Sequence, residues 1–286
     1  MIIPALPIGH FGELAVTWVT AHCALIINVF GNTVTALDSG VLTTLTAIPA
    51  VAAIVIIAML AWYSAGTGLA VFAALGLFLV TNQGLWLATM KTLALVLTAT
   101  CLSLLVAIPL GIAMTESRTL RAGATPILDF LQTMPRFVYL IPAVSILGID
   151  VAPAVFATMT LAVIPPTRMT ALGISAVDPE TIEAAKSMGC SRMQLLLKVK
   201  LPLAIPAIML GVNQCLMMSL SMVIIASLIG ASGLGDEILM AIAVLDPGRG
   251  VVAGLAVLIL AITLDRMTRG WVSRARSFGR LGQYRK

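Results

Sequence analysis

The stretch TMKTLALVLTATCLSLLVAIPLGIAM, residues 89–114, decides the fold class. It is apolar almost throughout, and its one charged residue, Lys91, lies close to its beginning. A helix that crosses the hydrocarbon core of a bilayer needs roughly 20 mainly apolar residues. The stretch therefore predicts a membrane-spanning helix.

The composition of the whole chain indicates that this span is one of several. Of the 286 residues, 60% are apolar and only 10% are charged, and the mean hydropathy is +1.08. An ordinary soluble domain carries roughly 25% charged residues. The composition excludes a cytosolic enzyme, a secreted disulfide scaffold, a disordered chain and a free nucleic-acid-binding protein. We expect an all-α polytopic membrane protein.

Seven stretches have the apolar character of membrane spans. The second of them is short, so neighbouring helices or local thinning of the bilayer must support its ends. The approximate bounds of the seven are Ala47–Tyr63, Gly68–Val80, Thr89–Met114, Pro126–Leu147, Pro153–Ala171, Leu203–Ile229 and Val251–Leu264.

The segment before the first span is less regular. Residues 13–46 are apolar on average but include polar residues such as His22 and Asp38. We favour an amphipathic helix that lies in the membrane interface, and an eighth span is the alternative. The expected organisation is an interfacial segment at 1–46, a transmembrane domain at 47–271 with a long loop at about 172–202, and a basic tail at 272–286.

The basic residues predict the orientation of the chain. If the loop at about 172–202 is cytoplasmic, fourteen of the 17 Lys and Arg fall on the cytoplasmic side. The opposite orientation would place them outside, against the rule that positive charge stays inside. We therefore expect a cytoplasmic C-terminus and, with seven spans, an extracytoplasmic N-terminus.

The long loop carries helix signals in the sequence DPETIEAAKSMGCSRMQLLLKVKLP, residues 178–202. Asp178 is a favourable N-cap and Pro179 suits the first helical position. Gly189 fits a left-handed C-cap, and Ser191 can cap a second helix. The pattern predicts two short helices joined by a sharp bend outside the bilayer.

The surface of the first of these helices suits docking. Ala184 and Ala185 are small and let another backbone approach closely, while Glu183 supplies a carboxylate beside them. Such a helix fits a groove on a soluble partner. The alternative is an ordinary solvated loop helix.

The loop resembles the EAA motif of ABC importer permeases. That motif is Glu-Ala-Ala, three residues, Gly, nine residues, an aliphatic residue, one residue and Leu-Pro. Every position and every spacing matches, with Glu183, Ala184, Ala185, Gly189, Val199, Leu201 and Pro202.

The chain resembles permeases of the glycine betaine/proline type from about Leu14 to about Thr268. The segments that carry it are TLALVLTAT (92–100), IPLGIAM (108–114), MPRFVYLIP (134–142), LPLAIPAIMLGVNQ (201–214), SMVIIASLIGASGLG (221–235) and ILAITLDRMT (259–268).

The resemblance implies the membrane subunit of a type I, ATP-driven importer of compatible solutes, which are usually quaternary ammonium compounds. It implies a five-span core with two extra N-terminal spans, in a bacterial cytoplasmic (inner) membrane. Two permeases would pair with two ATPase subunits, and an extracytoplasmic binding protein would deliver the solute. Residues 183–189 would form the coupling helix that docks on the ATPase, with Leu201 and Pro202 completing the motif.

The chain contains no GxxxxGK[ST] phosphate-binding loop. We therefore expect ATP and Mg to bind a separate ATPase chain, and this chain to be a transport subunit with no catalytic residue, cofactor or metal site of its own. Its expected contacts are with protein partners and membrane lipid, not with nucleic acid. A permease for another small solute such as methionine, or an ion-coupled secondary carrier, is the alternative.

Arg136 is the most unusual residue in the predicted spans, because charge within a span is costly and indicates a functional site. It falls near the middle of the fourth span, with Asp129 and Gln132 on the same helical face as candidate partners. One hypothesis is a polar contact along the solute path, for instance with a carboxylate. The other is that Arg136 extends to the cytoplasmic surface.

The sixth span carries further candidates for the solute path. Polar side chains in a span either line a path or form hydrogen bonds between helices, and methionines offer an adaptable wall or ordinary packing. These candidates are Asn213, Gln214, Met217, Ser219 and Ser221.

Overall fold

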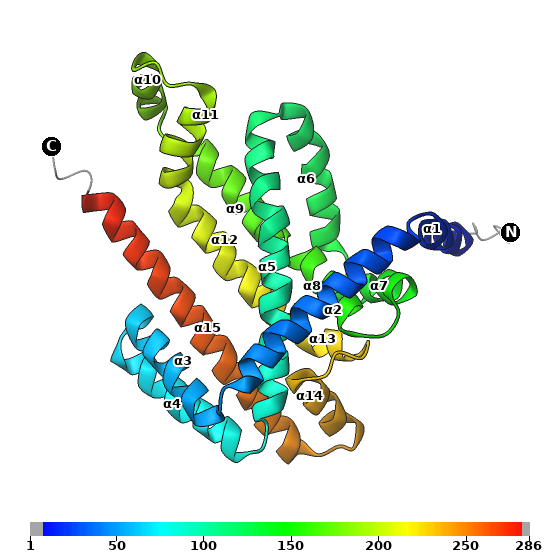
Figure 1. Cartoon of the computed structure of the whole chain (residues 1–286). Helices are drawn as coiled ribbons and strands as arrows, with labels where there is room; N and C mark the ends of the chain where they lie inside the picture. The colour runs from blue at the N-terminus through cyan, green and yellow to red at the C-terminus, as the bar shows by residue number, and fades with distance from the viewer. Residues whose placement is uncertain (1–7, 282–286) are drawn as a thin grey trace, which may run out of the picture.

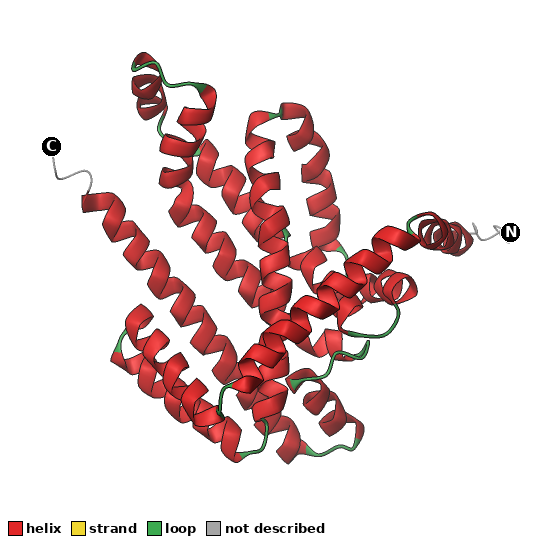
Figure 2. Ribbon diagram, in the orientation of Figure 1, coloured by secondary structure: helices red, strands yellow, loops and turns green. Residues whose placement is uncertain are grey.

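The regular structure is helical throughout the part of the chain that the computed structural model describes, residues 8–281, which confirms the all-α expectation (Figure 2). The helices are α1 (Ile8–His22), α2 (Ala24–Ala47), α3 (Ala50–Ala65), α4 (Thr67–Asn82), α5 (Trp86–Glu116), α6 (Arg118–Thr133), η1 (Arg136–Tyr139), α7 (Leu140–Leu147), α8 (Val151–Ala162), α9 (Ile164–Ser175), α10 (Pro179–Ser187), α11 (Arg192–Leu195), η2 (Leu196–Lys200), α12 (Leu201–Ser221), α13 (Val223–Ser227), α14 (Leu234–Ala243) and α15 (Pro247–Leu281).

Helix α5 is the central element of the bundle (Figure 1). It has 31 residues, and nearly half of them are buried. It packs against α2, α8, α9 and α12. A single span buried on so many sides explains why the stretch at 89–114 is apolar all round rather than on one face.

Five helical segments are long and apolar enough to cross a membrane, and a sixth is added if the bent pair at 118–147 counts as one span. The five are α2, α5, residues 151–175, residues 192–227 and residues 247–271. The expected spans at Ala47–Tyr63 and Gly68–Val80 correspond to α3 and α4, which have 16 residues each and pack against each other. The chain is therefore polytopic.

The expected fourth span, Pro126–Leu147, is not one continuous helix, and this expectation is corrected. The chain turns by 110° between the α6 helix and the η1–α7 segment. Pro135 explains the break, because a proline disfavours the helical conformation in the residue before it. Met134 is accordingly extended, with φ −66° and ψ 139°. Arg136 therefore begins the 3₁₀ turn η1 instead of lying inside a helix.

Two other expected spans each contain one irregular residue, Val163 or Met222, but run on as single segments. Pro165 and Pro166 occupy the first turn of α9, so the span at Pro153–Ala171 is divided into α8 and α9. The sixth expected span, Leu203–Ile229, contains α12, which ends at Ser221, and the short α13 beyond it.

The two ends of the chain also differ from simple expectation. Helix α2 has 24 residues and the length and composition of a span, as the eighth-span alternative requires. The last helix does not stop near Leu264 but continues to Leu281, so most of the basic segment at 272–286 extends α15. Residues 1–7 and 282–286 lie outside the described residues.

Glycines allow α5, α9 and α12 to approach one another closely, as small residues do between membrane helices. A Cβ atom added to Gly111 of α5 would lie 2.7 Å from the Thr167 carbonyl oxygen of α9. A Cβ atom on Gly211 of α12 would lie 2.8 Å from Pro166 Cα. Any side chain at these two positions would force the helices apart.

Candidate coupling loop and polar path

The loop at 178–202 contains the short helix α10 and the start of a second helix, and both helices have the predicted caps. The Asp178 carboxylate accepts a hydrogen bond from the Glu180 backbone N–H at 3.1 Å, with Pro179 in the first turn of α10. Gly189 ends α10 with φ +80°, in the left-handed region. Ser191 and Gln194 form a reciprocal capping box at the start of α11. The local signals in the sequence therefore predicted the caps and the sharp bend correctly, but the second helix is not short, because α11 continues through η2 into α12.

Helix α10 projects from one end of the bundle (Figure 1) and packs chiefly against α11. Glu183 and Ala184 are exposed, whereas Ala185 is buried. Only one of the two alanines thus contributes to the outer surface, which corrects the expectation that both would. Met188 at the end of the helix is 85% exposed, and sequence reasoning did not single it out.

The loop rejoins the bundle at Leu201 and Pro202, the first residues of α12. Leu201 packs against the cluster formed by Ile174, Ala204 and Ile208, while Pro202 is exposed. Because α11, η2 and α12 follow one another without a gap, the loop is joined directly to the long α12 helix.

Two of the candidate path residues, Arg136 and Ser221, meet where α12 ends. The Arg136 guanidinium donates a hydrogen bond from Nη1 to Ser221 Oγ at 3.0 Å. Two residues earlier in α12, Ser219 accepts a hydrogen bond from Thr100 Oγ1 of α5 at 3.2 Å, and both side chains are buried. Gln214 is exposed and lies seven residues before Ser221, on the same helical face.

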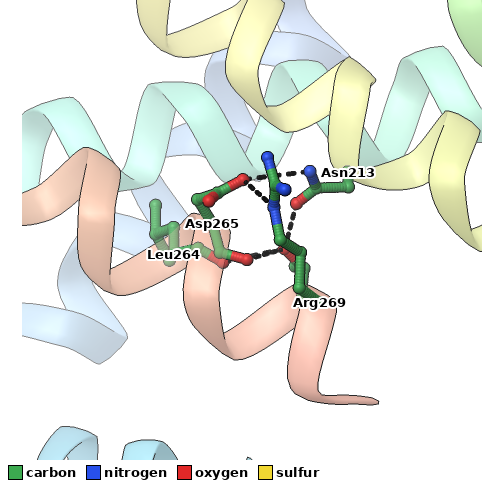
Figure 3. A network of polar contacts seen from close by, with 5 residues as sticks. Asn213, Leu264, Asp265 and Arg269 are labelled. Atoms are coloured by element: carbon green, nitrogen blue, oxygen red, sulfur yellow. Dashed lines mark hydrogen bonds and ion pairs between the residues drawn. The ribbon is translucent and has the colours of Figure 1, made fainter. Parts of the chain in front are cut away.

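Two other candidates on α12 have structural roles. Asn213 is buried and donates from Nδ2 to Asp265 Oδ1 of α15 at 3.0 Å, and it accepts a hydrogen bond from the Thr268 hydroxyl (Figure 3). Met217 is partly buried against the apolar cluster that contains Met90 and Leu216. Both residues thus take part in contacts between helices.

The expected partner of Arg136 is engaged elsewhere. Asp129 forms an ion pair with Arg168 of α9. The turn at Pro135 separates the two halves of the expected span, so Asp129 and Arg136 no longer share a helical face. The expectation of a pair between Asp129 and Arg136 is therefore wrong.

The glycine-rich segment at 230–235 is anchored to α5. The Leu234 backbone N–H donates to Thr92 Oγ1 at 2.8 Å, and the Leu234 side chain is fully buried. A Cβ atom on Gly233 would lie 2.6 Å from the same hydroxyl oxygen. The close approach explains why glycine stands at this position.

The residues from 107 to 277 match the family model described as the binding-protein-dependent transport system inner membrane component. This match covers more than half of the chain and includes the loop at 178–202. The chain belongs to this family. It is a multi-pass permease subunit of a binding-protein-dependent importer in the inner membrane.

Several permeases are similar to this chain over most of its length. The glycine betaine transport system permease protein OpuAB of Bacillus subtilis (strain 168) is 41% identical over 97% of this chain and 98% of its own. The glycine betaine/carnitine transport permease protein GbuB of Listeria monocytogenes serotype 1/2a (strain 10403S) is 47% identical over 73% of this chain and 74% of its own. The glycine betaine/proline betaine transport system permease protein ProW of Escherichia coli (strain K12) is 40% identical over 96% of this chain and 77% of its own.

The fold of the permease is also similar to that of a solved structure. A chain of the MetNI methionine ABC transporter in an inward-facing conformation superposes with a TM-score of 0.60, over 65% of this chain and 93% of that chain. The two share 19% sequence identity. The likeness confirms the type I importer fold and carries no information about the solute.

Proposed function

We propose that this permease carries a compatible solute, a small methylated amine such as glycine betaine, choline or proline betaine, into the cell at the expense of ATP. The observation that carries the proposal is the nearly end-to-end likeness to a permease named for glycine betaine transport. The motif at Glu183–Gly189 and the projecting α10 helix support the coupling to an ATPase.

The proposed assembly has two copies of this permease, two ATPase subunits that bind ATP and Mg, and an extracytoplasmic solute-binding protein. Glu183 and Ala184 present the exposed surface of α10 to the ATPase, and Gly189 gives the helix its sharp end. The buried Ala185 lies on the side of α10 that packs against α11.

The coupling motion follows from the connection between the loop and the path. ATP binding closes the ATPase pair and displaces α10. Since α11, η2 and α12 are continuous, the displacement passes through Leu201 and Pro202 into α12. The far end of α12 holds Ser219 and Ser221, so the motion changes the polar contacts at the path and converts the permease between inward- and outward-facing forms.

The proposed orientation places α10 and the C-terminus in the cytoplasm. Arg118, Arg121 and the basic residues of the α10 loop then lie on the inner side. The turn between α3 and α4 falls on the same side, because the Gly270 region of α15 contacts Ser64 and Ala65. If α2 lies on the membrane surface, the N-terminus is extracytoplasmic. If α2 crosses the membrane, the N-terminus is cytoplasmic.

The energy source distinguishes this proposal from an ion-coupled carrier. The test uses vesicles that contain the permease, its ATPase and its binding protein, with labelled glycine betaine outside. The proposal predicts uptake when ATP is enclosed, with no requirement for a sodium or proton gradient. Uptake that follows an imposed ion gradient without ATP would overturn it. Vesicles that lack the ATPase are the control.

A further inference from the structure

Arg136 combines a charged side chain with a break in the membrane helices. Polar backbone without helical pairing is tolerated at membrane depth only where it is buried in protein or lines a water-filled cavity. Met134 and Pro135 form such a break before Arg136. The hydrogen bond between Arg136 and Ser221 therefore joins this break to the end of α12.

The depth of the break follows from helix lengths. Helix α6 begins one residue after α5 ends, and it packs back along α5. Its 16 residues rise about 24 Å, whereas the 31 residues of α5 rise about 46 Å. The end of α6 thus lies beside the middle of α5, as Figure 1 shows. Thr100, near the midpoint of α5, contacts Ser219, which lies near the end of α12 that also carries Ser221.

The direction of the Arg136 side chain excludes the alternative hypothesis of an arginine that extends to the membrane surface. Such a side chain would run back along α6 toward headgroups. The guanidinium instead reaches across to Ser221 on α12. The Ser221 hydroxyl donates its own proton to the Met218 carbonyl oxygen at 2.8 Å, so its lone pair is free to accept from Arg136.

Arg136 also lacks a counter-charge. Four of the other basic side chains, those of Arg168, Lys200, Arg249 and Arg269, have a carboxylate partner. Within the described part of the chain, the neutral Ser221 is the hydrogen-bond partner of Arg136, and no ion pair is formed by its guanidinium. A guanidinium has five N–H donors and matches a carboxylate in a bidentate geometry. Most of its donors are thus available to a ligand.

We propose that Arg136 binds the carboxylate of the transported solute, and that the permease thereby favours carboxylate-bearing betaines over amines without a carboxylate, such as choline. Ser221 holds the guanidinium across the path between loading events. The inference rests on the proposed function, because it requires a methylated amine solute. Within that solute class it predicts a preference for methylated amines that carry a carboxylate.

The test compares wild type, Arg136→Gln and Arg136→Lys in vesicles that contain the complete complex with ATP inside. The probes are labelled glycine betaine and labelled choline. Hydrogen bonds to charged groups are worth about 1.5–3 kcal/mol, so the glutamine variant should take up betaine at least about tenfold more slowly. Lysine keeps the charge without the bidentate geometry and should restore part of the rate. Choline uptake, where wild type shows any, should not fall.

Arg121→Gln is the matched control, because Arg121 is an exposed arginine at the opposite end of α6. Co-purification of the ATPase shows that each variant assembles. Undiminished betaine uptake by Arg136→Gln, an equal loss of betaine and choline uptake, or wild-type uptake of choline without betaine would overturn the inference. Wild-type vesicles that take up neither of these amines, nor any of the other methylated amines offered in the same assay, would instead contradict the proposed function itself.

Discussion

Asn213 of α12 and Asp265 of α15 are joined by a hydrogen bond of 3.0 Å although 52 residues separate them in the sequence. Asp265 also accepts from Arg269 Nε at 2.8 Å, and Asn213 accepts from Thr268 (Figure 3). The network satisfies the polar groups of a buried asparagine between two membrane helices. It ties the helix that follows the coupling loop to the last helix of the bundle.

Substitution of Asn213 should therefore destabilise the permease. Asn213→Ala removes one of the donors to the partly buried Asp265 carboxylate, which costs about 1–3 kcal/mol. The Thr268 hydroxyl keeps the Leu264 and Asp265 carbonyl oxygens as acceptors. The thermal unfolding midpoint of the purified permease in detergent should fall. Gln214→Ala, at an exposed neighbouring position, should change stability by no more than about 0.5 kcal/mol. Equal midpoints for the two variants would show that the network does not contribute to stability.

The contact of α5 with α9 at Gly111 makes a second prediction. Gly111→Ala would place a Cβ atom 2.7 Å from the Thr167 carbonyl oxygen, and overpacking of this kind costs about 1–3 kcal/mol. Gly123→Ala is the matched control, because Gly123 lies in α6 and no atom lies within 4 Å of its added Cβ. Alanine is favoured over glycine in a helix by up to about 1 kcal/mol, so the control should be neutral or stabilising. The prediction fails if Gly111→Ala unfolds at the wild-type temperature.

The sequence predicted what local chemistry determines. The caps at Asp178, Gly189 and Ser191 act within a few residues, and the structure confirms all three. The all-α fold follows from the apolar composition. The predictions failed where distant segments meet. Nothing near Asn213 indicates that it will pair with Asp265.

The bend at Pro135 had a signal in the sequence, but hydropathy averaged over 126–147 did not register it. A proline pushes the preceding residue out of the helical region, and a span drawn through Met134 and Pro135 neglects that constraint. The same error led to the predicted pair of Asp129 and Arg136, because two residues share a helical face only when one helix contains both. The outward face of α10 was likewise undetermined, since which alanine is buried depends on packing against α11.

Ala184 makes a third prediction, about the docking surface. Ala184→Trp adds bulk to an exposed position of α10, so it should block the ATPase without unfolding the permease. Co-purified ATPase and ATP-dependent uptake should both fall by at least about tenfold, a loss of about 1.4 kcal/mol in binding. The unfolding midpoint of the permease alone should not change. Arg121→Trp, at an exposed position outside the loop, is the control and should keep both ATPase co-purification and ATP-dependent uptake. Full ATPase binding by Ala184→Trp would show that α10 is not the docking surface.

The proposed orientation gives a fourth prediction. A reporter enzyme that is active only in the cytoplasm, fused after Lys286, should be active because the basic loop and the C-terminal helix lie inside. A reporter that requires export should be inactive at the same position. The reverse pattern would invert the orientation and remove α10 from the reach of a cytoplasmic ATPase. The same pair of reporters fused before Met1 shows whether α2 crosses the membrane.

The solute tests the central claim most directly. Vesicles with the complete complex and enclosed ATP would be offered labelled glycine betaine, proline betaine, carnitine, choline, trimethylamine N-oxide, proline and methionine in turn. We predict ATP-dependent uptake of at least one methylated amine, with the carboxylate-bearing betaines fastest. Uptake of methionine alone would keep the ATP-driven mechanism and contradict the compatible-solute assignment.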